Sequence, residues 1–260
     1  MSATRVSIVK CPPKPNQVQI DLGVRKAIEL AGGLGKLKKG ASVLIKPNIC
    51  SPATPGNGQV ANPLVARAVA DVVREHGGNP IIAESAGVLD EGTEASFQAN
   101  GYAELRDQGY EVIDLKAPGT ILSKVNIPNA KVLKQVTLPK IVVDADMVIS
   151  IPVMKTHAGQ KVTLALKNLK GMLPDTWKKK LHTVYGVAPG LVDVLSARRP
   201  GFALVDGLIG QEGLGPIVGT PIEMNIFIAG QDIVAVDAVT SAIMGFDPAE
   251  IPMTTARVQP

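Results

Sequence analysis

A lysine and a histidine stand two residues apart just after a long apolar run near the middle of the chain. The run is MVISIPV (147–153), and Lys155 and His157 follow it. A lysine in this position can hold a carboxylate or a phosphate, and a histidine can also exchange protons near neutral pH. These residue types therefore predict an anion-binding site with His157 as its acid or base.

Three other apolar runs also end in polar side chains that a hydrophobic core does not need. SVLI is followed by Lys46 and Asn48, PIIA by Glu84, and FALV by Asp206. Open α/β sheets bind ligands in the crevice outside the carboxyl ends of their strands, so neighbouring strands would bring these groups to one rim. We expect Lys46 and Asn48 to bind the ligand, and Glu84 or Asp206 to be the carboxylate that complements His157. A solvated loop after SVLI and a helix cap at Glu84 are the competing interpretations.

The charge of the chain is concentrated in one basic stretch. Residues 155–182 contain seven lysines and one acid, a net charge of +6, which leaves −2 for the rest of a chain whose total is +4. A basic stretch on a near-neutral body favours an acidic small ligand over a general nucleic-acid coat. Aromatic residues make up only 3%, which also speaks against nucleic acid, because single-strand binders stack bases on aromatic rings. The run Lys178–Lys180 is interpreted as solvated surface.

The segment TLALKNLKGM (163–172) is predicted to be a helix that presents further ligand-binding groups. Lys167 and Lys170 are three residues apart and would share one face, with Asn168 between them and Gly171 ending the helix. The competing interpretation is an ordinary solvated helix face.

Two carboxylates and a glycine further along the chain are less easily assigned. The segment 206–219 is predicted to be a glycine-rich loop, in which Gly207 would let backbone N–H groups approach an anion. It has neither GxGxxG in a strand-to-helix setting nor GxxxxGK[ST], so it matches no nucleotide fingerprint. Asp206 and Glu212 could ligate a cation or form turns there. Asp237, within an apolar helical segment, either caps a neighbouring loop or faces a site.

The cysteines and histidines do not suggest a metal centre. Cys11 and Cys50 are the only cysteines and form no CxxC, so we expect no iron–sulfur cluster from this chain alone. His157 and His182 are in neither HxH nor HxxxH spacing, and no metal is assigned. The cofactor is therefore unknown.

Nothing in the sequence indicates a membrane or an export signal. The N-terminus lacks the apolar core of a signal peptide, and no apolar run approaches membrane-spanning length. We expect a soluble cytoplasmic protein.

Apolar runs alternate with amphipathic segments along the chain, which predicts an α/β fold with mostly parallel sheet flanked by helices and built from βαβ units. One α/β domain is expected over residues 1–260, with two sub-domains at about 1–115 and 141–260 and a less regular connection at 116–140. The expected strands are 4–9, 42–48, 80–85, 111–115, 147–153, 202–207 and 223–230. The expected helices are 21–30, 63–75, 94–107, 163–172, 190–200 and 232–245.

Five ordered segments, KPNIC, MKTH, TLALKNLKGMLP, DGLIGQEGLGP and AGQDIVAVDAV, resemble the domain-of-unknown-function-362 family over about residues 5 to 250. The family has no established general activity. Its members are often linked to iron–sulfur proteins and many carry ferredoxin-like cysteine clusters, so the resemblance implies a redox or iron–sulfur protein partner. This chain departs from the pattern because two cysteines cannot supply a four-cysteine cluster. The positions that match the recurring polar and glycine residues of the family are Lys46, Asn48, Lys155, His157, Lys167, Asn168, Gly171, Asp206, Gly207 and Asp237.

Three functions remain open from the sequence. The first is an enzyme that acts on a small anionic metabolite or cofactor, held by lysines and asparagines with His157 as acid or base. The second is a redox accessory protein that docks an iron–sulfur partner through the basic stretch. The third is a non-catalytic anion or nucleic-acid binder, whose affinity for nucleic acid would fall steeply with salt.

Overall fold

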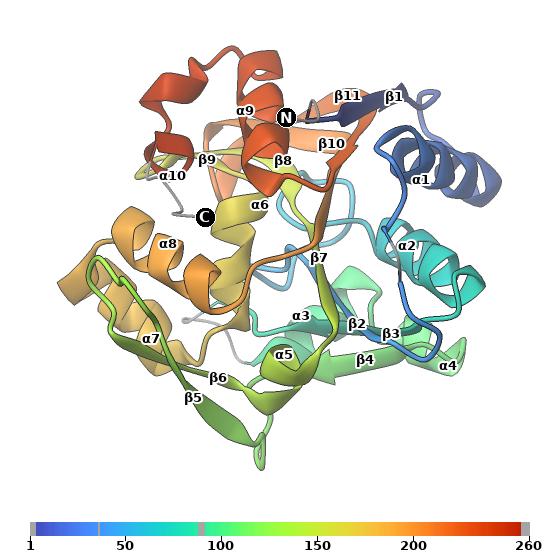
Figure 1. Ribbon diagram of the computed structural model, residues 1–260. Coiled ribbons are helices and arrows are strands. Elements are labelled where there is room, and N and C mark those ends of the chain that lie inside the picture. The colour runs from blue at the N-terminus through green and yellow to red at the C-terminus, as the bar shows by residue number, and fades with distance from the viewer. Residues whose placement is uncertain (1–3, 36, 88–91, 256–260) are drawn as a thin grey trace.

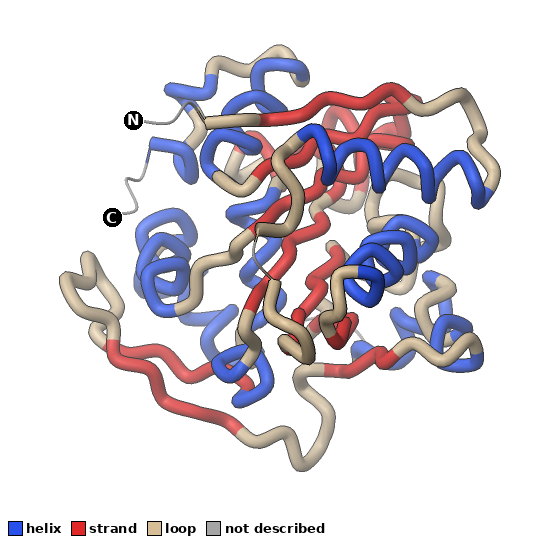
Figure 2. The backbone as a smooth tube through the Cα atoms, turned by 45° about the vertical axis from the view of Figure 1, so that its right-hand side comes forward, coloured by secondary structure: helices blue, strands red, loops and turns tan. Residues whose placement is uncertain are grey.

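A large mixed sheet with helices on both faces forms the body of the molecule in the computed structural model, which describes residues 4–35, 37–87 and 92–255 (Figures 1 and 2). The path through the sheet runs β1-β11-β10-β7-β2-β3-β4, and β8 and β9 extend it beside β10. Its strands are β1 (Val6–Lys10), β2 (Ser42–Pro47), β3 (Asn79–Glu84), β4 (Glu111–Asp114), β7 (Met147–Ile151), β8 (Val153–His157), β9 (Lys161–Thr163), β10 (Phe202–Leu214) and β11 (Val218–Gly230).

The centre of the sheet is parallel and one side is antiparallel. Neighbouring strands from β4 to β10 pair in parallel, whereas β11 pairs antiparallel with both β10 and β1. The predicted α/β fold with mostly parallel sheet is therefore confirmed. Strands from both expected sub-domains enter the same sheet, because β7 lies between β10 and β2.

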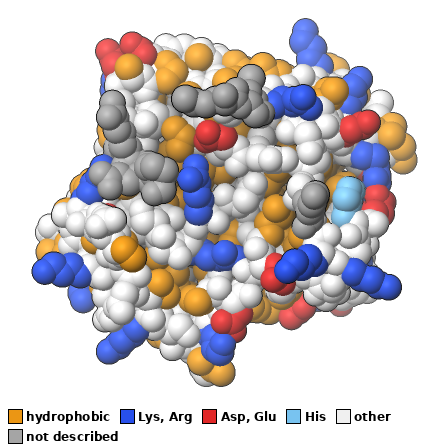
Figure 3. Space-filling model, viewed as in Figure 1, with side chains coloured by type: hydrophobic (Ala, Val, Ile, Leu, Met, Phe, Trp, Pro, Cys, Tyr) orange, Lys and Arg blue, Asp and Glu red, His pale blue; other side chains and the backbone are white. Residues whose placement is uncertain are grey.

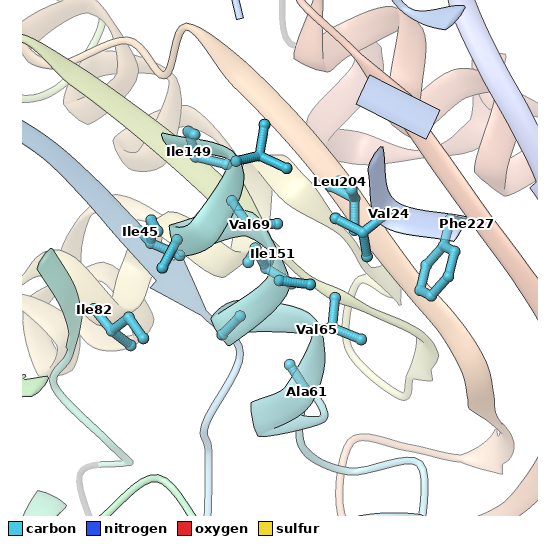
Figure 4. Packing of buried hydrophobic residues seen from close by; sticks show 14 of the residues in the cluster. Val24, Ile45, Ala61, Val65, Val69, Ile82, Ile149, Ile151, Leu204 and Phe227 are labelled. Atoms are coloured by element: carbon cyan, nitrogen blue, oxygen red, sulfur yellow. The ribbon is translucent and has the colours of Figure 1, made fainter. Parts of the chain in front are cut away.

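Alternate side chains of the central strands pack against two separate helical layers. On β2, Val43 and Ile45 belong to one buried cluster, and Leu44 belongs to the other. This period of two is expected for a sheet that is covered on both faces. Figure 4 shows the first cluster, where Ile45 lies against Val69 of α2.

The helices divide between these two layers. The first cluster contains residues of α1 (Gln17–Leu30), α2 (Pro63–Glu75), α3 (Thr93–Asn100) and α4 (Glu104–Asp107). The second contains residues of α5 (Lys140–Asp144), α6 (Ala165–Asn168), α8 (Val187–Ala197), α9 (Ile233–Ile243) and α10 (Pro252–Thr255). Between α6 and α8 lie the 3₁₀ helix η1 (Leu169–Met172), α7 (Asp175–Lys180) and the π-helical turn η2 (Leu181–Tyr185). A short 3₁₀ helix, η3 (Pro248–Glu250), precedes α10.

The expected glycine-rich loop at 206–219 is wrong. β10 and β11 instead form a long hairpin whose register runs from Ala203 opposite Gly230 to Leu214 opposite Val218. The glycines allow close packing of backbones: a Cβ on Gly210 would lie 2.6 Å from the carbonyl oxygen of Met154 on β8. Glycine in a strand often marks such an approach. The glycine-rich composition of residues 206–219 therefore belongs to paired strands and not to a loop.

The single helix expected at 163–172 is also wrong. Residues 161–163 form β9, and two short helices, α6 and η1, follow. The helix expected at 94–107 is divided into α3 and α4 by Gly101, whose φ of 79° ends α3 in the left-handed conformation. The first helix begins earlier than expected, at Gln17, because the side chain of Asn16 caps it.

The connection at 116–140 contains a separate antiparallel hairpin. β5 (Leu122–Asn126) pairs with β6 (Gln135–Pro139) in a two-stranded sheet of their own. It lies at the lower edge of the molecule in Figure 1, away from the main sheet.

Candidate functional site

A pocket lies at the carboxyl ends of β2 and β3 and beside the paired strands β8 and β9, and we call it the strand-end pocket. Its volume is about 170 Å³, which is small beside the roughly 300–1,000 Å³ of pockets for drug-sized ligands. It is lined by Lys46, Asn48, Ile49, Cys50, Glu84, Ser85, Gly87, Lys155, His157, Thr163, Lys167, Asn168, Lys170, Gly171, Lys178, His182 and Pro216. The structure thus brings together nine of the twelve site residues that the sequence suggested.

Lys46 and Glu84 form a buried ion pair at the base of the pocket. The Lys46 ammonium donates to a Glu84 carboxylate oxygen at 2.5 Å, to the Pro47 carbonyl at 2.7 Å and to the Asn168 side-chain oxygen at 2.7 Å. Three acceptors use all three protons of an ammonium group. Lys46 therefore has no proton left for a ligand.

Glu84 and Asn168 are committed to the same network. The Glu84 carboxylate also accepts from the backbone N–H groups of Ile49 and Ser85. The Asn168 amide donates to the Lys46 carbonyl and to the Ser150 hydroxyl. Burial raises the pKa of the Glu84 carboxyl, and Lys46 opposes that rise. These contacts fix the positions of β2, β3 and α6 relative to one another.

Gly171 is required by the close approach of η1 to this ion pair. A Cβ at this position would lie 1.9 Å from the nearer Glu84 carboxylate oxygen and 2.6 Å from Cε of Lys46. Any side chain larger than hydrogen would have to displace one of these groups. Gly171 thus determines the packing of the pocket wall.

Lys178 corrects the interpretation of 178–180 as solvated surface. Its side chain is buried, and its ammonium donates to the Ser85 carbonyl and hydroxyl, to the Ala86 carbonyl and to Asp175. α7 turns it inward, whereas Lys179 and Lys180 are exposed. A run of three lysines does not reveal which member faces the protein.

Three lysines keep N–H groups that are free for a ligand among the residues that the structure describes. Lys155 donates to the Gln59 carbonyl at 2.6 Å and contacts the Cys50 sulfur at 3.2 Å. Lys170 lies 2.6 Å from the His182 ring nitrogen Nε2. Lys167 has only a 3.5 Å contact with the Thr163 hydroxyl.

Burial and mutual repulsion depress the basicity of two of these lysines. Burial, followed by the charges of Lys170 and Lys155, lowers the pKa of Lys167 to about 7. Burial and the charge of Lys178 lower the pKa of Lys170 to about 8. An anion in the pocket would raise both pKa values again, because it interacts favourably with the protonated amines.

His157 lies on the wall of the pocket as a neutral ring with an assigned tautomer. Its Nδ1 accepts from the Gly159 backbone N–H at 3.0 Å, so the proton of the neutral ring is on Nε2. Burial and the charges of Lys167 and Lys155 lower the His157 pKa to about 4. His157 can therefore donate a hydrogen bond from Nε2.

Asn48 supplies an unpaired polar group. The residue is 7% exposed, and its side-chain oxygen is buried with no hydrogen-bond partner among the described residues. Buried polar groups are normally paired, so an acceptor left open on the wall of a pocket fits a ligand that carries a hydroxyl or an N–H group.

Three expected site residues lie outside the lining of the strand-end pocket. The buried Asp206 accepts from the backbone N–H groups of Asn62 and Leu208 and so joins the start of α2 to β10. Gly207 packs against the Ile226 carbonyl on β11. Asp237 accepts from the N–H groups of Ala165 and Leu166 at the start of α6, which is the capping alternative left open by the sequence.

Cys50, Thr163 and Pro216 are lining residues that the sequence analysis did not select, and His182 was considered only as a metal ligand. Pro216 comes from the tip of the β10–β11 hairpin, which the expected loop could not place. Cys50 directly follows the KPNI segment and could have been included as its continuation.

Five lysines and two histidines are gathered in the lining of this pocket. On the face drawn in Figure 3, basic side chains are interspersed with acidic and hydrophobic ones.

Within the described ranges, no cluster of three or more His, Cys, Asp or Glu residues is arranged to hold a metal ion. No helix in that part of the chain is both long and apolar enough to cross a membrane.

The family model for "Domain of unknown function (DUF362)" matches residues 43–242, a range that contains every lining residue of the pocket. The chain belongs to this family. The chain is also 32% identical over 251 residues to the thylakoid-associated protein sll1697 of Synechocystis sp., covering 90% of this chain and 73% of that protein. The expected cytoplasmic location therefore stays a prediction.

A solved structure resembles the fold of this DUF362 protein. It is the lactate racemase apoprotein from Thermoanaerobacterium thermosaccharolyticum, with a TM-score of 0.50 and 12% sequence identity. The match covers 89% of this chain, and this chain spans 61% of the racemase chain. At this identity the likeness concerns the α/β fold alone.

Proposed function

We propose that this protein is an enzyme that binds a small carboxylate or phosphate compound in the strand-end pocket. One observation carries the proposal: Lys155, Lys167 and Lys170 line a small pocket together and retain N–H groups that no described residue accepts. Lys155 is buried, and Lys167 and Lys170 are partly buried. Cations in such surroundings repel one another and lose hydration, so the arrangement is stabilised by an anionic ligand.

The side chains beside these lysines support a reactive site. His157 would donate a hydrogen bond from Nε2 to an oxygen that gains negative charge, as groups of an oxyanion hole do. Asn48 would accept from a hydroxyl or N–H group of the ligand. Lys167, with a pKa of about 7, is suited to exchange protons near neutral pH.

The buried network beneath the pocket has a positioning role in this proposal. Lys46, Glu84 and Asn168 have their hydrogen bonds satisfied within the protein. Asp206 and Asp237 brace neighbouring elements. The proposal therefore assigns ligand contact to fewer residues than the sequence suggested.

Thermal unfolding with a panel of anions tests this proposal. The panel contains inorganic phosphate, pyruvate, succinate and lactate, the last because the racemase of similar fold acts on it. A ligand at about a hundred times its Kd should raise the Tm by about 5 °C or more.

A matched pair of variants locates the binding. Lys170→Met should weaken the binding at least about tenfold, a loss of about 1.4 kcal/mol, because it removes a cation from the wall. Lys180→Met removes an exposed lysine of the same basic stretch and should leave affinity unchanged. Equal losses in both variants, or no shift with any anion, would refute the proposal.

A further inference from the structure

Lys167 differs from the other lysines of the strand-end pocket in how little it is hydrogen-bonded. Lys46 and Lys178 each donate to three or more protein acceptors. Lys155 has a carbonyl at 2.6 Å, and Lys170 has a ring nitrogen at the same distance. Among the described residues, Lys167 has a single contact at 3.5 Å, with the Thr163 hydroxyl, so none of these residues holds its amine in place.

The surroundings of Lys167 favour its neutral form. It is partly buried, and two further lysines, Lys155 and Lys170, face the same small cavity. Burial, followed by the charges of Lys170 and Lys155, brings its pKa to about 7, so much of it is the free amine near pH 8. A desolvated lysine beside other cations is a known arrangement for nucleophilic amines.

We infer that Lys167 is a nucleophile that forms a Schiff base with a small carbonyl compound bearing a carboxylate or phosphate group. This inference rests on the proposed function, because the anionic group of the substrate would be held by the neighbouring lysines. It adds the class of substrate and the bond that is formed.

The chemical step needs no oxidant, reductant or further reactant. The lone pair of Nζ attacks the carbonyl carbon and the C=O π electrons move to oxygen. That oxygen takes a proton, and the ammonium nitrogen formed by the attack gives one up, so its lone pair is restored. The resulting carbinolamine loses water: its hydroxyl leaves with one more proton as the nitrogen lone pair forms the C=N bond.

Two lining groups are suited to handle these protons. The Lys170 ammonium, with a pKa of about 8, can protonate the departing hydroxyl near neutral pH. The Nε2–H of His157 can donate a hydrogen bond to the oxygen while it carries charge. The protonated C=N nitrogen then withdraws electrons from the adjacent carbon.

Reductive trapping tests the inference directly. The full chain is incubated near pH 8 with sodium cyanoborohydride and either pyruvate or dihydroxyacetone phosphate, then digested with trypsin and analysed by mass spectrometry. We expect a reduced adduct on Lys167 at least about tenfold above that on exposed lysines, because their neutral fraction is far smaller. The two probes distinguish a carboxylate substrate from a phosphate substrate.

Two arginine variants provide the controls. Lys167→Arg keeps a positive charge in the pocket but is always protonated, so it should still bind the probe and lose the adduct. Lys161→Arg changes an exposed lysine six residues earlier and should keep the adduct on Lys167.

The outcomes separate this inference from the proposed function. An adduct spread evenly over exposed lysines, or a probe that raises the Tm yet leaves Lys167 unmodified, would overturn the Schiff base and leave anion binding intact. If no anion of either class raises the Tm and no adduct forms, both proposals fail.

Discussion

Lys46 and Glu84 place two charges in the interior of the protein. Both side chains are at most 1% exposed, and every proton of Lys46 has an acceptor. Breaking such a pair leaves an uncompensated buried charge, which costs more than the intact pair contributes. The pair therefore determines whether the pocket keeps its shape.

Replacing Lys46 with methionine should lower the free energy of unfolding by about 3–5 kcal/mol. Glu84 would then keep only its two backbone donors and would be more readily protonated. Urea denaturation followed by circular dichroism measures the change. Lys10→Met, at an exposed position on β1, should alter stability by no more than about 0.5 kcal/mol. Equal effects of the two substitutions would contradict this assignment.

At the residue scale the sequence identified the chemical types better than their roles. Lys155 and His157 were expected at one site because they follow an apolar run, and Lys167 because it shares a predicted helix face with Lys170. All three line one pocket. The order of residues could not show that Lys46 has no free proton, since its acceptors come from β3 and α6 as well as from its own strand.

Among the elements, η1 carries Lys170 and Gly171 directly over the Lys46–Glu84 pair. The helix can lie this close only because residue 171 has no Cβ. α6 directly precedes η1. Asp237 on α9 holds the start of α6, because its carboxylate accepts two backbone N–H groups there. Gly171 in the lining and Asp237 outside it thus fix the segment that presents Lys167.

Gly171→Ala should destabilise the fold by about 1–3 kcal/mol, the usual cost of an overpacked position, and should weaken phosphate binding as η1 is pushed outward. Thermal unfolding and calorimetric titration report the two effects. Gly159→Ala is the matched control, because its Cβ would find its nearest neighbour atom at 3.7 Å and should change stability by no more than about 0.5 kcal/mol. If Gly171→Ala unfolds and binds as the wild type does, η1 does not constrain the pocket.

Strands and long helices could be predicted from apolar periodicity, whereas the hairpin of β10 and β11 could not. Its glycines resemble those of a loop in composition, and only the partner strands show that they allow close contacts between backbones. The short helices α6 and η1 escaped prediction for a related reason: α6 begins where Asp237, seventy-two residues away, accepts its first N–H group.

For the whole molecule, one sheet gathers the pocket from strands that are distant in sequence. β2, β3 and β7 are adjacent in the sheet, so groups from residues 46 to 216 meet at one edge. The concentration of lysines in one stretch predicted a basic site. The sequence could not show that Lys178 faces inward while its neighbours are solvated.

The protonation of the lysines in the pocket should be coupled to the binding of an anion. Lys167 and Lys170 have pKa values of about 7 and 8 because each is buried beside other cations. On the proposed function, a bound anion would raise both pKa values, so the complex would hold more protons than the free protein at a pH near or above these values. The protein is therefore expected to take up protons when it binds an anion.

Calorimetric titration with inorganic phosphate near pH 8, in two buffers of different ionisation enthalpy, measures this linkage. We expect the wild-type protein to take up about one proton per phosphate, and Lys167→Arg to bind phosphate with less than about half of that uptake, because arginine is always protonated. Absence of phosphate binding, or equal proton uptake by the wild type and Lys167→Arg, would contradict a pocket in which Lys167 titrates beside a bound anion.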